Sequence, residues 1–300
     1  MRNRLMRILM TGKNGQLGFE LQRALAPLGE VVAVGTDDCN LADGAALREL
    51  IQKVHPDVIV NAAAYTAVDK AETDQDMAHA VNAQAPGILG EEAAKLGASV
   101  IHFSTDYVFD GEKAGSYTET DPTNPQSAYG RTKLQGEQGL AEATPHHLIL
   151  RTSWVVGAHG GNFAKTMLRL AAERDELKVV ADQFGAPTSA ALLADVTAHL
   201  VRQLAREGAE KFPYGLYHLT AGGDTSWHAY AQFVIDHALK MGKPLKTRPE
   251  RVLPIPAASY PTPAKRPHNS RMDTTRFQTA FSLVLPDWRL GVGHILQTIL

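Results

Sequence analysis

Hydrophobic positions along the chain form short, unbroken runs that alternate with segments of helical periodicity. The unbroken runs lie at residues 5–11, 31–34, 57–64, 99–105 and 148–156. Apolar residues recur at helical spacing in the segments 19–25, 45–54 and 81–96. A run without polar alternation is typical of a strand that is buried on both faces. The pattern therefore predicts an α/β fold with a doubly wound parallel sheet and right-handed crossovers.

The pattern loosens beyond residue 157. Amphipathic helices are predicted over 162–174, 190–206 and 226–241, with a short strand at 215–220. Prolines then accumulate between residues 249 and 267 and disfavour long helices and central strands. We expect a dinucleotide-binding domain over 1–156 and a smaller, irregular lobe, mainly for substrate, over 157–300. The two are expected to interleave, with 188–206 packing back on the first domain.

Glycines recur at every third position after the first predicted strand, as Gly12, Gly15 and Gly18. They permit a tight turn, and the free N–H groups at the start of the following helix suit a pyrophosphate. This spacing by itself is often only a turn. Because it lies between a strand and a helix at the start of the chain, it predicts a Rossmann-type dinucleotide site.

The end of the second predicted strand commonly selects the coenzyme, because an acid there bonds the ribose 2′-hydroxyl. This chain has Gly35 at that place, with Asp37 and Asp38 following. Lys13, within the glycine turn, offers a positive charge to a 2′-phosphate, although it is equally compatible with a solvated loop charge. We expect NADP(H) to be preferred and NAD(H) to be tolerated.

Tyr129 and Lys133 lie four positions apart on a predicted helix and therefore share one of its faces. An ammonium beside a phenol lowers the pKa of the phenol and makes it a usable acid near neutral pH. A Tyr-x-x-x-Lys pair is common on solvated helices. Here Ser104 and Thr105 end the fourth predicted strand at the edge where a nicotinamide is expected, which favours proton-transfer chemistry.

Composition narrows the class of protein. The chain has 300 residues, 44% hydrophobic and 21% charged, which is enough for a sizeable core. Its net charge of −2 gives no basic field for nucleic acid or an anionic membrane. The run at residues 5–11 is too short for a secretory signal, and Cys39 is the single cysteine. We expect a cytoplasmic protein without an intramolecular disulfide.

The sequence resembles the extended short-chain dehydrogenase/reductase superfamily, which shares the glycine turn, the Asn-Ala-Ala-Ala strand end, the Ser/Thr strand end and the Tyr-x-x-x-Lys helix. Further stretches are similar to the family of dTDP-4-dehydrorhamnose reductases. They lie at residues 61–72, 104–111, 151–155, 182–188 and 266–270. Asp-Gln-x-Gly-Ala-Pro-Thr and Arg-Pro-x-x-Ser among them are far more specific than any superfamily motif.

The resemblance implies that NADPH or NADH reduces the C4 ketone of dTDP-4-dehydro-β-L-rhamnose to dTDP-β-L-rhamnose, a precursor of bacterial surface polysaccharide such as lipopolysaccharide O-antigen. Tyr129 would donate a proton to the ketone oxygen, Lys133 would lower its pKa and hold the nicotinamide ribose, and Thr105 would bond the same oxygen. Sugar contacts are implied for Thr105, Asp106 and Trp154. Coenzyme contacts are implied for Gly12, Gly15, Gln16, Leu17, Asn40, Leu41, Ala63, Ala64, Tyr65, Tyr129 and Lys133.

Some positions are ambiguous or depart from the family pattern. Trp154 is also compatible with a core role. Lys265 and Arg266 are candidates for binding the substrate diphosphate, but they are also compatible with solvated surface charges. Some family members bind magnesium through glutamates between two subunits. This chain keeps Glu20, but Ala191 stands where a second glutamate is expected. We therefore expect no metal ligands, and both a magnesium requirement and a homodimer stay open.

Two alternatives compete with the reductase hypothesis. A non-catalytic NADP-binding regulatory subunit of the same fold is disfavoured by the intact Thr105, Tyr129 and Lys133. Another nucleotide-sugar reductase, an epimerase or a dehydratase is the second. Dehydratases generally need an acidic pair after the strand-end threonine, whereas Asp106 is followed by Tyr107. Epimerisation is disfavoured by the reductase-like stretches near the C-terminus.

Overall fold

The computed structural model describes residues 5–300, so the first four residues of the predicted dinucleotide-binding domain lie outside it. Its centre is a six-stranded sheet in the order β10-β5-β4-β3-β1-β2, in which every neighbouring pair is parallel. The strands are β1 (Met6–Thr11), β2 (Gly29–Val34), β3 (Val58–Asn61), β4 (Ser99–Thr105), β5 (His147–Thr152) and β10 (Gly215–His218). The predicted doubly wound α/β fold is confirmed.

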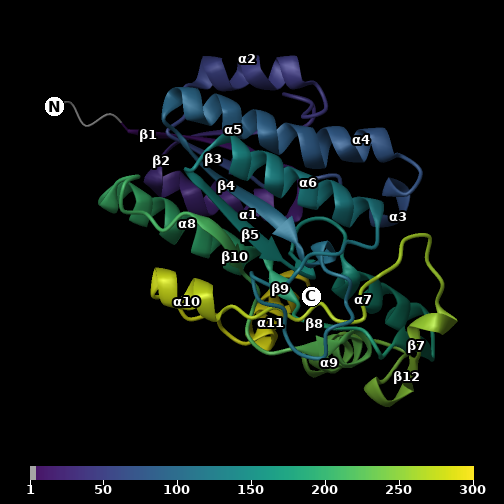
Figure 1. Cartoon of the computed structure of the whole chain (residues 1–300). Helices are drawn as coiled ribbons and strands as arrows, with labels where there is room; N and C mark the ends of the chain where they lie inside the picture. Colours follow the sequence, from purple (N-terminus) through teal and green to yellow (C-terminus); the bar gives the residue numbers. More distant parts are fainter. Residues whose placement is uncertain (1–4) are drawn as a thin grey trace.

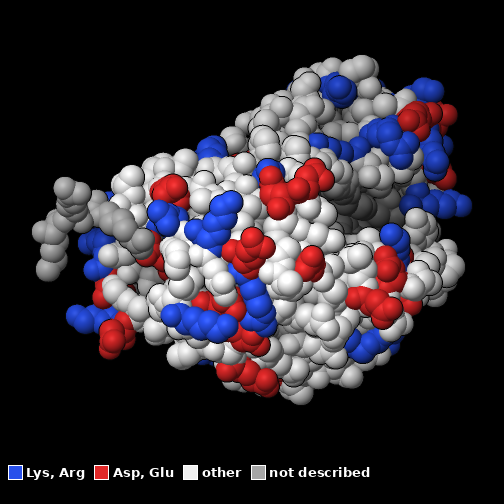
Figure 2. All heavy atoms as spheres, turned by 90° about the horizontal axis from the view of Figure 1, so that it is seen from above, with Lys and Arg blue, Asp and Glu red and all other residues white. Residues whose placement is uncertain are grey.

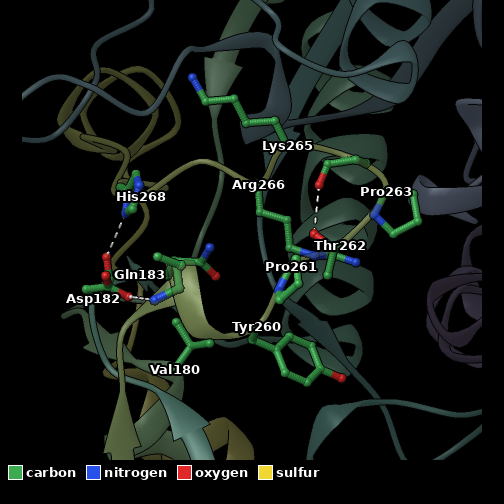
Figure 3. Close-up of a pocket in the computed structure, with 13 residues that line it drawn as sticks. Val180, Asp182, Gln183, Tyr260, Pro261, Thr262, Pro263, Lys265, Arg266 and His268 are labelled. Atoms are coloured by element: carbon green, nitrogen blue, oxygen red, sulfur yellow. Dashed lines mark hydrogen bonds between the residues drawn. The ribbon is translucent and has the colours of Figure 1, made fainter.

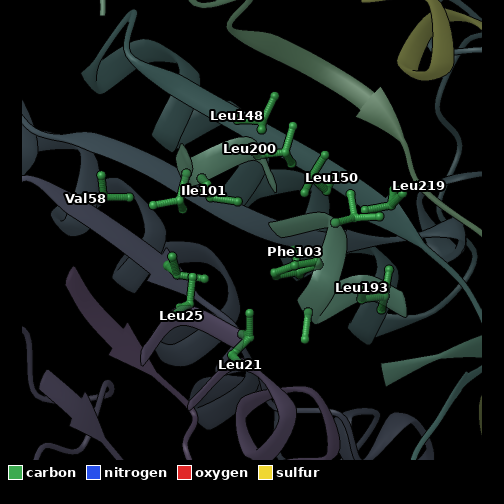
Figure 4. Packing of buried hydrophobic residues seen from close by; sticks show 14 of the residues in the cluster. Leu21, Leu25, Val58, Ile101, Phe103, Leu148, Leu150, Leu193, Leu200 and Leu219 are labelled. Atoms are coloured by element: carbon green, nitrogen blue, oxygen red, sulfur yellow. The ribbon is translucent and has the colours of Figure 1, made fainter. Parts of the chain in front are cut away.

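Helices cover both faces of the sheet (Figure 1). On one face lie α1 (Gln16–Leu25) and α8 (Ala190–Glu207); on the other lie α2 (Gly44–Val54), α5 (Ala85–Leu96) and α6 (Ala128–Ala143). Side chains alternate between the faces along each strand. Ile8 and Met10 join the core cluster under α1 and α8, whereas Leu9 joins the cluster under α2 and α5. Figure 4 shows the first of these clusters. The absence of polar alternation in the strands follows from this double burial.

The helix predicted over 81–96 begins earlier in the structure, at Gln75. A continuous helical run comprises α4 (Gln75–His79), the π-helical turn η2 (Ala80–Gln84) and α5. Pro86 has no N–H to donate to the carbonyl of Asn82, and one wider turn accommodates that loss. The Asn82 carbonyl lies against Gly136 of α6, where any side chain would overlap it. Two glycine-bearing helices can therefore pack tightly beside the sheet.

A second hydrophobic cluster, separate from the sheet, holds the smaller lobe together. It includes Tyr230, Val234, Trp288 and Val292. The elements of this lobe are α7 (Phe163–Glu173), α9 (Trp227–Lys240), α11 (Trp288–Ile299) and the parallel pair β7 (Leu177–Val180) and β12 (Val252–Ile255). Pro254 is tolerated in β12 because this sheet has only two strands, so both are edges.

Short elements complete the chain. They are α3 (Val68–Ala71), α10 (Thr275–Phe281), β6 (Val155–Val156), β8 (Phe184–Gly185), β9 (Thr188–Ser189), β11 (Thr225–Ser226), η1 (Ala26–Leu28), η3 (Asp106–Val108), η4 (Pro249–Arg251) and η5 (Ala257–Ser259). The hydrophobic pattern of the sequence does not predict α10 and α11. Among residues 5–300, no helix combines the length and the apolar content that crossing a bilayer requires.

Two predicted strands end earlier than the apolar runs suggest. The run at 57–64 leaves the sheet after Asn61, where the N–H of Ala63 turns toward Thr11 Oγ1 at 3.4 Å. The run at 148–156 is interrupted at Trp154, whose backbone adopts φ 48°. A positive φ is rare for a bulky residue and places its side chain in a direction that a continuous strand cannot give. Both interruptions occur at the carboxyl edge of the sheet.

Candidate active site

The glycine turn lies at the carboxyl edge between β1 and β3, where the order of strands reverses and open α/β sheets bind ligands. The fold itself requires two of its glycines. Gly12 has φ 79°, and a side chain there would lie 2.7 Å from Ala63 N; one at Gly18 would overlap the Gly12 carbonyl. A side chain at Gly15 would meet only Gly12 O, at 3.4 Å. Packing therefore does not require Gly15, and the space beside it stays open at the turn.

The N-terminus of α1 opens into this turn. Gly15 is its N-cap residue, and no side chain caps the helix. Its first N–H groups can therefore donate to an anion at the positive end of the helix dipole. The turn fits the pyrophosphate of a dinucleotide, as the spacing of the glycines predicts. Leu17 is buried in the core beneath it.

Gln16 connects the glycine turn to the loop after β6. Its Oε1 accepts hydrogen bonds from Gly157 N at 2.8 Å and Asn162 Nδ2 at 3.0 Å. In the same loop, the His159 ring stacks on Phe19 of α1, with 4.5 Å between ring centroids. The Gln16 side chain therefore ties the start of the smaller lobe to the coenzyme turn, a role that the sequence analysis did not foresee.

Charges of both signs meet at the end of β2. The Asp38 carboxylate accepts a hydrogen bond from Gly35 N at 2.8 Å and lies 2.6 Å from Lys13 Nζ. The hydrogen bond from Lys13 and the one from Gly35 hold the pKa of Asp38 below its usual range. The Asp38 carboxylate thus lies at the end of β2, where Gly35 itself provides no acidic side chain. The pair is partly exposed, and such pairs contribute little to stability.

The other predicted coenzyme positions surround this edge. Asn40 is exposed in the turn after β2, whereas Leu41 is 8% exposed and packs in the core. Ala63 and Ala64 follow β3 and are partly exposed beside Gly12. Tyr65 donates its hydroxyl to Asp74 at 2.9 Å, and Asn82 brackets its backbone through hydrogen bonds at its N–H and its carbonyl.

Tyr129 and Thr105 come together at the end of β4. The Thr105 hydroxyl lies close enough to Tyr129 to lower the pKa of the phenol, and Thr105 Oγ1 donates to Asp106 Oδ1 at 3.1 Å. Burial raises the pKa of the Asp106 carboxyl to about 6. The ring of Tyr107 meets that of Tyr129 edge-on at 5.5 Å. The arrangement gathers a phenol, a hydroxyl and a buried carboxyl around one point.

Lys133 does not act on Tyr129 as predicted. Its Nζ donates to the carbonyl of Phe103 at 2.6 Å and lies 3.2 Å from His102 Nε2, both on β4. Burial raises the pKa of Tyr129 above its usual range, and the hydrogen bond with Thr105 offsets only part of that rise. The predicted lowering of the phenol pKa is therefore wrong for this structure, because the amine is directed at the strand.

A buried ion pair supports the same helix one turn further along. Arg151 of β5 donates to both oxygens of Glu137, at 2.9 and 2.6 Å, and Ser104 donates to Oε1 as well. Both charged side chains are almost inaccessible to solvent. Removing one partner of such a pair costs roughly 3–5 kcal/mol. The pair fixes α6, and hence Tyr129 and Lys133, against β4 and β5.

Trp154 lies where two lobes meet. Its ring stacks on Trp227 of α9, with 3.6 Å between ring centroids and 12° between planes. On another side it approaches Gly185, where a side chain would lie 2.7 Å from Trp154 Cε2. Trp154 is partly exposed, so its indole is supported by other rings but not enclosed by them.

A cavity of about 440 Å³ lies between the proline-rich segment and the stretch after β7. Asp182 and Gln183 line one side, and Tyr260, Thr262 and Arg266 line the other (Figure 3). In the space-filling view a hollow opens in the molecule with Lys and Arg side chains at its rim (Figure 2). The cavity offers aromatic, amide, hydroxyl and guanidinium groups to one ligand.

Arg266 connects this cavity to Tyr107 at the end of β4. It donates to the Tyr107 hydroxyl at 3.2 Å and pairs with Asp69 of α3 at 2.7 Å. Lys265 extends in the opposite direction, and its Nζ lies 3.6 Å from Glu112. Of the two candidates for a diphosphate, only Arg266 contacts Tyr107, the residue whose ring meets that of Tyr129.

Glu20, which is kept from the glutamates that bind magnesium in some family members, is paired within this chain. Glu20 lies 3.4 Å from Arg23, whose guanidinium also pairs with Asp195 of α8 at 2.9 Å. Arg23 thus neutralises both carboxylates within the chain. Among residues 5–300, no three His, Cys, Asp or Glu side chains are grouped to hold a metal ion.

Several site residues were not identified from the sequence: Asn82, His102, Glu137 and Arg151. Each is buried, with exposures of 1 to 5%. A polar residue inside an apolar strand, such as His102 or Arg151, is the only signal that could have identified them. Their partners belong to other elements and are invisible in the local pattern.

Comparison with known proteins places these observations in a family. The family model described as RmlD substrate binding domain matches residues 6–300. The dTDP-4-dehydrorhamnose reductase of Shigella flexneri is 51% identical over 298 residues, covering 98% of each chain. A crystal structure of a dTDP-4-dehydrorhamnose reductase from Clostridium acetobutylicum is 37% identical, with a TM-score of 0.87, covering 98% of this chain and 99% of that one. The Bacillus anthracis enzyme, solved in complex with NADP, is 32% identical with a TM-score of 0.87, covering 98% and 99% of the two chains.

The position of Trp154 can be tested through Gly185. Gly185→Ala places a methyl group against the indole, and we expect it to displace Trp154 from Trp227 at a cost of about 1–3 kcal/mol in the free energy of unfolding. Urea unfolding measures the cost, and near-ultraviolet circular dichroism measures the loss of the stacked pair. Gly115→Ala is the control, because a side chain there meets nothing within 4 Å. An unchanged dichroism spectrum in Gly185→Ala would contradict this account of the glycine.

Proposed function

This chain belongs to the family of dTDP-4-dehydrorhamnose reductases described by the RmlD substrate binding domain, and we propose that it reduces the C4 ketone of dTDP-4-dehydro-β-L-rhamnose to dTDP-β-L-rhamnose. It is an NAD(P)H-dependent oxidoreductase of dTDP-rhamnose biosynthesis. The observation that carries the proposal is the meeting of Thr105 and Tyr129 beside a glycine turn that fits a dinucleotide.

The coenzyme, when bound, supplies the hydride that the ketone carbon receives. The ketone oxygen then gains negative charge, and Tyr129 donates its proton there while Thr105 hydrogen-bonds the same oxygen. Tyr129 holds its proton at neutral pH before reduction begins, and the negative charge that develops on the ketone oxygen makes that oxygen basic enough to take it. Lys133 stands one helical turn from Tyr129, where it would hold the nicotinamide ribose and replace the proton that Tyr129 loses.

The nucleotide part of the substrate is assigned to the cavity between Gln183 and Arg266. The Arg266 guanidinium suits a diphosphate, because it can donate two hydrogen bonds to one phosphate group. It would exchange its pairing with Asp69 for the diphosphate, and the partial exposure of that pair makes the exchange inexpensive. The sugar then lies between Arg266 and Tyr129, with Asp106 and Trp154 as its further contacts.

We place the reaction in the cytoplasm, where NADPH and sugar nucleotides are available. The described part of the chain contains no membrane-spanning helix. A homodimer is compatible with this assignment but is not required for it, because the groups assigned to the reaction all come from one chain.

The alternative functions fit less well. A regulatory subunit would have no use for Thr105 and Tyr129 at one strand end or for a lysine buried to 1% exposure. An epimerase would need to keep an oxidised coenzyme, take a hydride from its substrate and return it to the keto intermediate so formed. The decisive experiment is direct: purified protein, NADPH and freshly made dTDP-4-dehydro-L-rhamnose, with coenzyme absorbance followed and the product identified. No substrate-dependent oxidation of NADPH would overturn the proposal.

Tyr129→Phe removes the proton donor while keeping the ring against Tyr107. We expect turnover to fall by roughly two to four orders of magnitude, because general acid catalysis contributes about that much. NADPH affinity, measured by fluorescence, should stay near that of the parent protein. Near-normal turnover of the purified variant would remove Tyr129 as the acid.

The Asp38–Lys13 pair predicts how coenzyme preference is set. Asp38→Ala frees Lys13 and removes a negative charge near the 2′-phosphate, so we expect the ratio of kcat/KM for NADPH to that for NADH to rise about tenfold. Lys13→Met should lower the same ratio. Asp37→Ala is the matched control, because Asp37 forms no ion pair within residues 5–300. Equal ratios in Asp38→Ala and Asp37→Ala would reject this role for the pair.

Divalent cations provide a further test. Because Arg23 already pairs with Glu20 and Asp195, we expect EDTA to leave both the rate of NADPH oxidation and the elution volume in size-exclusion chromatography unchanged. A loss of activity on EDTA treatment that added magnesium restores would show that the carboxylates bind a metal after all.

A further inference from the structure

A row of buried polar side chains crosses the central sheet. Thr11 of β1 is in register with Asn61 of β3, and Asn61 with His102 of β4. The three side chains are 0%, 0% and 1% exposed. Each lies two residues after an apolar residue of its strand, namely Leu9, Ile59 and Val100. Side chains two residues apart on a strand lie on the same face, so the row lies on the face of the sheet covered by α5 and α6. This face changes from apolar to polar one step before the carboxyl edge.

The row is joined by hydrogen bonds and ends on Lys133. Thr11 Oγ1 donates to Asn61 Oδ1 at 2.6 Å, and the Asn61 amide lies 2.9 Å from His102 Nδ1. His102 Nε2 lies 3.2 Å from Lys133 Nζ, which also donates to the Phe103 carbonyl at 2.6 Å. The chain of contacts thus runs from the residue before the glycine turn to the lysine of the active site.

Packing does not explain such a row. Burial of polar groups costs free energy even when each has a partner, and the apolar residues at the preceding positions show that the same face accepts hydrophobic side chains. Polar groups that a fold does not need usually serve the site that they touch. Here that site is the amine of Lys133, the only group of the row that belongs to α6.

The imidazole and the amine constrain each other. An ammonium can only donate, so a charged Lys133 requires His102 Nε2 to accept and Nδ1–H to donate to the oxygen of Asn61. In the orientation described above, Asn61 Oδ1 faces Thr11 and Nδ2 faces His102, so Nδ1 accepts, Nε2 carries the hydrogen, and the amine facing it must be neutral. A charged amine requires the amide to turn over, and Thr11 Oγ1 then accepts from Asn61 Nδ2. The charge of Lys133, the tautomer of His102 and the orientation of Asn61 therefore change together.

We propose that His102 is a positioning residue of the reduction: its neutral imidazole holds the Lys133 amine against β4 and sets its charge, and Asn61 and Thr11 tie that state to the start of the glycine turn. The inference rests on the proposed function, in which Lys133 serves beside Tyr129. The sequence motifs do not include His102, and it needs no contact with substrate to act.

The electrostatic surroundings support this role. Burial lowers the pKa of Lys133 to about 8, and the charge of Glu137 on α6 opposes that fall. Glu137 is itself paired with Arg151 of β5. Burial, and then the charge of Lys133, keep the pKa of His102 well below its usual range, so the imidazole is neutral at physiological pH. Burial therefore favours the neutral amine, and a hydrogen bond donated by the charged amine to His102 Nε2 would oppose that effect.

The test uses two variants of the full chain. His102→Leu removes the acceptor; we expect the midpoint of the Lys133 titration, followed by its nitrogen-15 resonance in coenzyme-free protein, to fall by about one pH unit, a tenfold change in the ammonium population. The basic limb of the pH profile of kcat/KM should move down by the same amount. His102→Gln keeps an acceptor and should leave both within about 0.3 pH units of the parent value.

His218→Gln is the matched control. This histidine is equally buried, with its pKa lowered to about 3 chiefly by burial, but it bonds the Tyr117 carbonyl and does not touch Lys133. It should lower the melting temperature without moving the titration. If His102→Leu does not fold, His102→Asn, whose shorter side chain cannot reach Lys133, replaces it.

An unchanged Lys133 titration and pH limb in His102→Leu or His102→Asn would overturn the inference and leave His102 as packing. The nitrogen-15 titration needs no substrate. If the parent protein failed to reduce the keto-sugar, the proposed function would fall while the titration still decided whether His102 controls Lys133.

Discussion

The parallel register of β1, β3 and β4 is the constraint on which the rest of this structure depends. It brings the ends of three strands to one edge, and it aligns Thr11, Asn61 and His102 across them on one face. The apolar positions before that row bury the sheet under helices on both sides. The polar row lies between this apolar core and the carboxyl edge, where the proposed active site lies. A slip of one residue would direct these side chains into the opposite core.

The site is completed by contacts that cross between the lobes. Gln16 binds the loop after β6, Arg266 binds Asp69 and Tyr107, and Trp154 rests on Trp227. Each contact joins a residue of the sheet region to a segment far away in the sequence. The glycine turn, Tyr129 and the cavity of the proline-rich segment are thereby held in one arrangement, and the proposed reaction depends on that arrangement.

Charged groups in this site are balanced by partners within the chain. Asp38 neutralises Lys13, Asp69 neutralises Arg266, and Arg23 neutralises Glu20 and Asp195. The first two pairs are partly exposed and can be exchanged for phosphate at little cost. The buried Glu137–Arg151 pair cannot, because either charge left alone would be expensive. Exposure therefore separates the charges that are free to bind ligands from those that hold the fold.

The sequence by itself determined the fold class, the glycine turn and the identity of the catalytic candidates, because strand burial, turn geometry and Tyr-x-x-x-Lys spacing are local properties of the chain. Only the tertiary structure decided that the Lys133 amine is directed at β4 and that the Asp38 carboxylate lies at the end of β2. It also decided that Gln16 and Arg266 bind segments far away in the sequence. The helices α10 and α11 and the break at Trp154 were likewise settled by packing. The reason is physical: a pKa, an ion pair or a buried hydrogen bond depends on partners that come from other strands and helices, and local periodicity carries no record of them.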